Sequence, residues 1–188
     1  AGWGETPLSA AWGWPSAELS YLERENRMKA FCQTLAASWR NRSGAGHVME
    51  LGYEFLEHDL YPLARAEGIP QLAALICNSL FDLALHDAFG NLAGKPIYET
   101  YNAAYLPHDL SFYYRDAAFA GLYPEDFFVD RVPATLPVWH LVGGKDLLTA
   151  AELTGGEPQD GYPVILTDWI ERDGLKCLKI KLTGSRSE

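Results

Sequence analysis

The sequence predicts an α+β chain in two parts, a mostly helical N-terminal domain followed by the beginning of a parallel β/α domain. Two observations support this fold class. Apolar residues recur at helical spacing in three long runs between residues 17 and 92. Two short apolar runs typical of buried strands, 137–144 and 174–184, come later and enclose a helical run, as parallel neighbouring strands require.

The composition is that of a globular, acidic protein. The chain has 188 residues, 48% of them hydrophobic, so it can bury a sizeable core. Asp and Glu number 25 against 15 Lys and Arg, which gives a net charge of -10 and argues against nucleic acid or an anionic membrane as a partner. The three cysteines are widely spaced, which predicts reduced core thiols. With neither a signal peptide nor an uninterrupted apolar run of 18 residues visible, we expect a cytoplasmic protein.

Three helices are expected in the first part of the chain. The first covers 17–41, with Ser16 or Ser20 as its cap, and the second covers 47–66. The third covers 71–92 and is apolar almost all round, so we expect it to be buried on several sides.

Two stretches outside these helices carry many aromatic residues. Residues 1–16 are rich in Gly, Pro and Trp, which predicts the end of a strand followed by a loop. Residues 102–133 read as an aromatic-rich insertion that covers a domain junction or an oligomer interface. We therefore place one domain at 1–133 and a second at 134–188. In the second, a short helix is expected over 145–153 and another over 162–173, between the two strands.

The last strand carries the candidate catalytic residues. Because strand side chains alternate between faces, Lys179 and Lys181 share one face with Cys177, and Leu178, Ile180 and Leu182 share the other. In a closed α/β barrel the apolar face packs under the helices, and both lysines project inward near the strand's C-terminal end. Their Cα atoms lie roughly 6.6 Å apart. Each ammonium group then disfavours the charge of the other, which leaves a neutral amine able to act as a general base.

Three segments together resemble one enzyme family. They are GWGETP at 2–7, SLFDLALHDAFGNLAGKPIY at 79–98 and GLKCLKIK at 174–181. In this order they resemble the mandelate racemase and muconate lactonising enzyme branch of the enolase superfamily. Asn91 departs from the pattern, since Lys is commoner there. The resemblance implies an enolase-like α+β capping domain, with the insertion, followed by the start of a (β/α)7β TIM-like barrel.

The resemblance also implies a reaction. Members of this family abstract the proton α to a carboxylate and stabilise the enolate with Mg²⁺, as dehydratases or as racemases and epimerases. Lys181 would be the general base or acid, and Lys179 would lie beside the carboxylate of a small carboxylate substrate. Trp12 and Trp14 would lie on the capping loop that binds the substrate, or would be packing residues. A homo-oligomer is expected.

The metal ligands of the family come from the third to fifth barrel strands. This chain ends before those strands, so we assign no metal ligand to it and expect it to be a fragment, inactive alone. Two other interpretations stay open. The chain could be a catalytically incomplete binding or assembly domain of the same fold. It could also be an unrelated α/β protein whose lysine strand is solvated.

Overall fold

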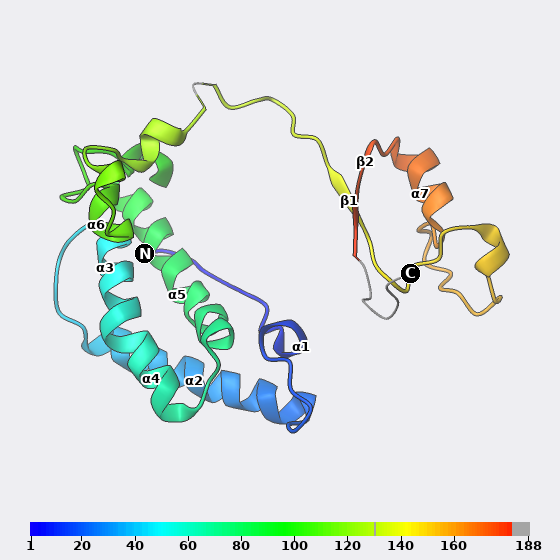
Figure 1. Cartoon of the computed structure of the whole chain (residues 1–188), viewed down its shortest axis with the longest axis horizontal. Helices are drawn as coiled ribbons and strands as arrows, with labels where there is room; N and C mark the ends of the chain where they lie inside the picture. The colour runs from blue at the N-terminus through cyan, green and yellow to red at the C-terminus, as the bar shows by residue number, and fades with distance from the viewer. Residues whose placement is uncertain (130, 182–188) are drawn as a thin grey trace. The chain divides into compact units, whose positions relative to one another are not determined.

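A computed structural model of the chain describes residues 1–129 and 131–181 (Figure 1). It divides into two compact units, Ala1–Phe128 and Val129–Glu188. The division falls at Phe128, before the boundary expected at residue 133. Each unit is described by itself below.

The first unit is helical, and its three predicted helical runs are confirmed (Figure 1). The helices and their bounds are α1 (Ala10–Gly13), α2 (Tyr21–Asn41), α3 (Val48–Phe55), α4 (Tyr61–Glu67) and α5 (Gln71–Ala93). Helix α2 starts later than expected because Ser20, and not Ser16, is its cap: the Ser20 side chain accepts the N–H of Glu23 at 3.2 Å. The second predicted helix is interrupted by a π-helical turn, Leu56–Leu60, which joins α3 to α4.

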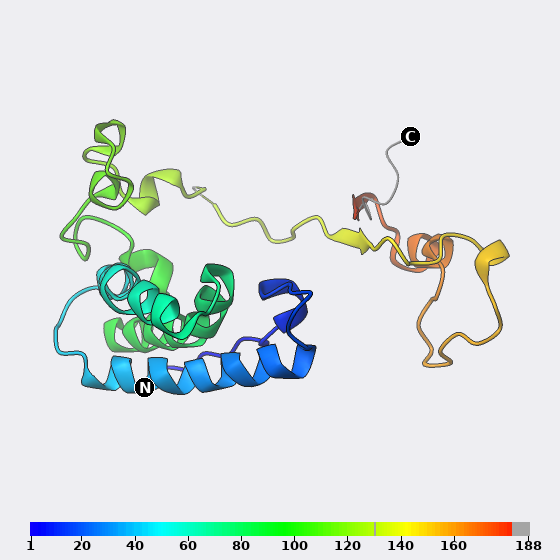
Figure 2. The same cartoon turned by 60° about the horizontal axis from the view of Figure 1, so that its bottom comes forward.

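The core of this unit lies where α2, the α3–α4 rod and α5 meet (Figure 2). Its largest fully buried side chains are Phe31, Phe55, Met28, Leu35 and Leu60. The ring of Trp39 stacks on Phe55 at a centroid distance of 3.8 Å, while its indole N–H donates to the amide oxygen of buried Asn78 at 3.0 Å. Apolar packing therefore holds the helices together, and one satisfied polar pair fixes how α2 meets α5.

Helix α5 is apolar all round but is not buried all round. Its buried residues are small ones, such as Ala73, Ala74 and Gly90. In contrast, Leu72, Leu83 and Leu92 are 42%, 48% and 85% exposed. The prediction of burial on several sides is therefore wrong at these positions. Within the described residues, α5 is also the one helix long and apolar enough to cross a membrane by length and composition. It packs against α2, α3 and α4.

The N-terminal segment lies directly on α5. A Cβ atom added at Gly2 would meet the carbonyl oxygen of Ala84 at 2.0 Å, and one at Gly4 would meet that of Leu80 at 2.1 Å. Glycine is therefore required at both positions, since any side chain would collide with the helix backbone. The expected strand end is not formed here: residues 1–9 are outside any strand, because the described residues provide no neighbouring strand to pair with.

The aromatic insertion packs onto α3. It contains α6 (Leu110–Tyr114) and short 3₁₀ turns at Ala117–Phe119 and Pro124–Phe127, after an earlier turn at Ile97–Thr100. The ring of Tyr53 on α3 makes edge-to-face contacts with Phe112 and Tyr113, at centroid distances of 5.5 and 5.3 Å. The insertion is thus part of the first unit up to Phe128.

The second unit contains the expected parallel pair of strands. Its elements are β1 (Trp139–Val142), a 3₁₀ turn (Ala150–Glu152), α7 (Leu166–Asp173) and β2 (Cys177–Ile180). β1 and β2 run parallel, with Leu141 opposite Lys179. The helix expected over 145–153 is wrong apart from the 3₁₀ turn. The part of the last predicted strand from Leu182 onward lies outside the described residues.

Candidate functional site

The two faces of the β1–β2 pair differ, as strand alternation requires. His140 and Val142 belong to the face covered by α7: the His140 ring lies 5.3 Å from the ring of Trp169, and Val142 is only 6% exposed. Their partners in the register, Leu178 and Ile180, belong to the same face, but Ile180, at the end of β2, is 66% exposed and therefore not covered. The opposite face is open.

The open face carries Lys179. Its neighbour across the pair is Leu141, 46% exposed, and the residues two positions before them are Trp139, 64% exposed, and Cys177. The sequence correctly placed Cys177 and Lys179 together on the face away from the helix. The lysine ammonium group thus stands beside apolar side chains on an open sheet surface.

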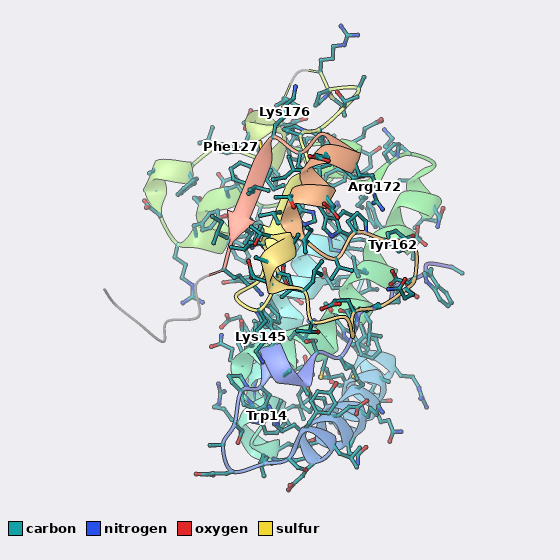
Figure 3. All side chains as sticks on the ribbon, turned by 90° about the vertical axis from the view of Figure 1, so that its right-hand side faces the viewer. Trp14, Phe127, Lys145, Tyr162, Arg172 and Lys176 are labelled. Carbon is teal, nitrogen blue, oxygen red and sulfur yellow. The ribbon has the colours of Figure 1, made fainter. Side chains whose placement is uncertain are left out.

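Lys181 continues the same row just after β2. Its backbone N–H donates to the carbonyl oxygen of Val142 at 2.9 Å, so the ladder extends one step past the strand. Because the side-chain period is two, Lys181 falls on the same face as Lys179. Lys176 precedes the strand and is exposed (Figure 3). The two candidate lysines therefore gather at the C-terminal end of the parallel pair, and Lys176 does not.

A turn follows β1 at the same end of the sheet. The Asp146 carboxylate accepts the N–H of Gly143 at 2.6 Å, which closes a turn that contains the exposed Lys145. A cavity of about 430 Å³ lies behind this turn, lined by His140, Lys145 and Trp169 among others. Neither Lys179 nor Lys181 lines it. The candidate lysines thus lie on an open sheet face and not in this cavity.

The α7 helix carries a cationic stack near that cavity. The guanidinium of Arg172 lies 4.4 Å from the ring centroid of Trp169 and 5.3 Å from that of Tyr162 (Figure 3). Arg172 also forms an ion pair with Asp173 at 2.8 Å, which lowers the pKa of that carboxyl. These contacts hold Tyr162 in the loop against α7 and leave the lysine face clear.

No metal centre is found among residues 1–129 and 131–181: no three His, Cys, Asp or Glu side chains gather closely enough there to hold an ion. The residues described do not fit a Mg²⁺ site.

The two tryptophans expected on a substrate loop differ in environment. Trp12, on α1, is 63% exposed. Trp14 is 6% exposed, its ring lies 4.8 Å from the Arg27 guanidinium, and its backbone carbonyl accepts a hydrogen bond from Arg24. Trp14 thus has the packing role that the sequence left open, while Trp12 is accessible to a ligand.

Sequence reasoning missed a polar cluster that anchors the insertion. A Glu50 carboxylate oxygen accepts from His108 at 2.7 Å and from the Tyr113 hydroxyl at 3.4 Å. Burial, together with this carboxylate, raises the pKa of Tyr113. The partners lie 58 and 63 positions from Glu50 in the sequence, so no local pattern could have indicated them.

The chain was compared with protein-family models, curated proteins and solved structures, and none of them matches it.

Proposed function

We propose that this chain carries the capping domain and the first barrel strands of an enolase-superfamily enzyme that removes the proton α to a carboxylate. The observation that supports the proposal best is the parallel pairing of β1 with β2. It leaves Lys179 on the face away from α7, with Lys181 next in the same row.

The orientation of the two sheet faces and of the strand ends matches the one expected for a barrel active site. In β/α barrels the helices cover the outer face of the strands, the other face points inward, and catalytic groups lie at the C-terminal ends. Helix α7 covers the face of His140 and Val142, and the lysine row runs to the C-terminal end of β2.

The chemistry assigned to the two lysines is a proton transfer. The neutral amine of Lys181 takes the α-proton, so that an N–H bond forms, the C–H bond breaks and the electron pair enters an enolate. The ammonium of Lys179 lies beside the substrate carboxylate and offsets the growing negative charge. Reprotonation on the other face gives a racemase or epimerase, and loss of a β-hydroxyl gives a dehydratase. Mg²⁺ remains an expectation of the resemblance, with its ligands outside the elements described.

Two features of the first unit give physical reasons for glycines of the resembling segments. A Cβ atom at Gly90 would lie 3.2 Å from the carbonyl oxygen of Lys95, and Gly94 ends α5 with a φ of 66°. A side chain at Gly90 would thus need the Lys95 backbone to shift, and the left-handed backbone at Gly94 favours glycine. These two features support the capping-domain assignment of this unit.

A second candidate is a binding or assembly domain of the same fold. It is favoured by exposed apolar side chains on the first unit, among which Trp3 is 76%, Leu92 85% and Tyr98 66% exposed. Apolar surface of this kind is typical of interfaces. This candidate predicts that the protein binds a partner without catalysing a reaction. It also predicts the expected homo-oligomer.

The deciding experiment follows exchange of the α-proton with solvent deuterium. The complete protein, of which this chain is expected to be a part, is incubated with Mg²⁺ in D₂O with acid sugars, 2-hydroxy acids and N-acyl amino acids, and deuterium at the α-carbon is measured by mass spectrometry. The proposal expects exchange for one of these classes, lost in Lys181→Ala and kept in Lys176→Ala. Exchange that persists in Lys181→Ala removes this lysine from the role of base.

A further inference from the structure

Two cysteines face each other across the interface of α2 and α5. The Cys32 thiol, on α2, lies 3.8 Å from the backbone carbonyl oxygen of Cys77, on α5. The Cys77 thiol in turn lies 3.5 Å from the carbonyl oxygen of Met28, one helical turn before Cys32. Each sulfur therefore contacts the backbone of the other helix at the level of its counterpart.

The two thiols differ in access and in acidity. Cys77 is fully buried, whereas Cys32 is partly exposed. The neighbouring Cys77 side chain lowers the pKa of the Cys32 thiol, while the neighbouring Cys32 side chain and burial raise the pKa of the Cys77 thiol. Because the thiolate is the nucleophile, the more accessible and more acidic Cys32 reacts first with an oxidant in solution. Cys77 is protected until its neighbour has reacted.

We propose that Cys32 and Cys77 are an oxidisable pair that forms an intramolecular disulfide when a peroxide is present. The Cys32 thiolate attacks one peroxide oxygen, the O–O bond breaks, and a sulfenic acid and one water result. The sulfur of Cys77 then attacks the Cys32 sulfur, and the second water leaves with the remaining thiol proton. Two thiols and one hydrogen peroxide thus give one disulfide and two waters.

The geometry of the helices suits this product. A disulfide needs its sulfurs about 2 Å apart and its Cα atoms within about 7 Å. The two cysteines lie at one level of two packed helices, and each sulfur lies within 4 Å of a backbone oxygen of the other helix. The bridge joins residues 45 positions apart and ties the two longest helices of the unit together.

The third cysteine can be removed so that it does not interfere with a test of the pair. Cys177 is part of the second unit, on the open face of β2, and is removed as Cys177→Ser so that it cannot form mixed disulfides. The protein is treated with hydrogen peroxide, its intact mass is measured, and its proteolytic peptides are mapped with and without a dithiol reductant. We expect loss of the mass of two hydrogen atoms, a linked peptide pair containing Cys32 and Cys77, reversal by the dithiol, and a higher melting temperature when oxidised.

Two variants test separately the role of Cys32, which reacts with the peroxide, and that of Cys77, which forms the disulfide. In Cys77→Ala the sulfenic acid at Cys32 has no partner, so a dimedone-type carbon nucleophile labels Cys32. In Cys32→Ser, Cys77 stays unmodified under the same treatment because it is buried. Three results overturn the proposal, and each is read on the parent protein without any variant: both thiols unchanged, oxygen added at Cys32 while Cys77 stays free, or a disulfide between two molecules. The proposal does not depend on the enzymatic function above.

Discussion

The backbone N–H of Trp3 donates a hydrogen bond of 2.7 Å to a carboxylate oxygen of Asp87, 84 positions later in the sequence. The Asn91 amide, one turn further along α5, donates to the carbonyl oxygen of Ala1 at 3.2 Å. Asp87 thus holds the N-terminal segment on α5, and its neighbour His86 bonds elsewhere, to the carbonyl oxygen of Asp82 at 2.8 Å. Asp87 and His86 thus have separate structural roles.

Removing the Asp87 carboxylate should loosen the N-terminal segment. Asp87→Ala deletes the acceptor of the Trp3 N–H, and we expect a loss of about 1 kcal/mol in the free energy of unfolding, measured by urea denaturation. Asp87→Asn keeps an acceptor oxygen and serves as the control, with a smaller loss. Equal stabilities for the alanine variant and the parent would contradict this role.

The substitution Gly4→Ala, which adds a methyl group, should lower the free energy of unfolding. Its Cβ would lie 2.1 Å from the carbonyl oxygen of Leu80, so the segment must lift off α5, and we expect about 1–3 kcal/mol of destabilisation. Gly46→Ala is the matched control, because the nearest atom to its Cβ, a Glu50 carboxylate oxygen, lies at 3.8 Å. Equal unfolding midpoints for the two variants would show that the segment does not pack on α5 as described.

The stability of the first unit should depend on pH through His47. This ring is 2% exposed; Nδ1 accepts the N–H of Met49 at 3.2 Å, so Nε2 carries the proton toward the Thr100 hydroxyl at 3.0 Å. Burial, and secondarily His86, lower the pKa of His47, against a smaller opposing effect of Glu50. Protonation of Nδ1 would break the bond to Met49.

The sign follows from that lowered pKa. The unfolded chain binds the proton more readily than the folded one, so stability is fully present above about pH 6.5 and falls as the pH drops toward the folded pKa. Unfolding measured between pH 5 and pH 8 should show this slope in the parent protein. His47→Asn keeps an N-cap acceptor without titrating and should reduce the slope. An identical pH profile in both proteins would refute the role of His47.

Much of the helical architecture could be predicted from the sequence because it depends on local patterns. The apolar spacing located α2 and α5, and the alternation in the last strand placed Lys179 opposite the helix-covered face. The helix expected over 145–153 failed because the Asp146 side chain closes a turn and Leu147 pairs with Ile165 in a parallel bridge. Local propensity does not reveal such tertiary pairing.

The bridge between Leu147 and Ile165 also explains why α7 begins later in the sequence than predicted. The N–H of Leu166 donates to the carbonyl oxygen of Leu147 at 2.9 Å, which holds Ile165 in extended backbone, so the helix begins only at Leu166.

Contacts between distant segments also could not be predicted from the sequence. The Glu50–His108 pair and the Cys32–Cys77 approach each join residues 45 or more positions apart. For the site, the sequence indicated the lysine face but not the cavity beside β1.

The central claim is that Lys181 is the base of the reaction, and chemical rescue tests it most directly. The measurement is the rate of α-proton exchange into D₂O by the Lys181→Ala protein, with increasing concentrations of a small primary amine such as methylamine. The account predicts a loss of roughly 10²-fold or more without amine, since general bases contribute that much, and recovery in proportion to the amine added. The Lys176→Ala protein should keep parent rates and show no response to amine. Parent-like exchange in Lys181→Ala, or a loss equal in both variants, would contradict the account.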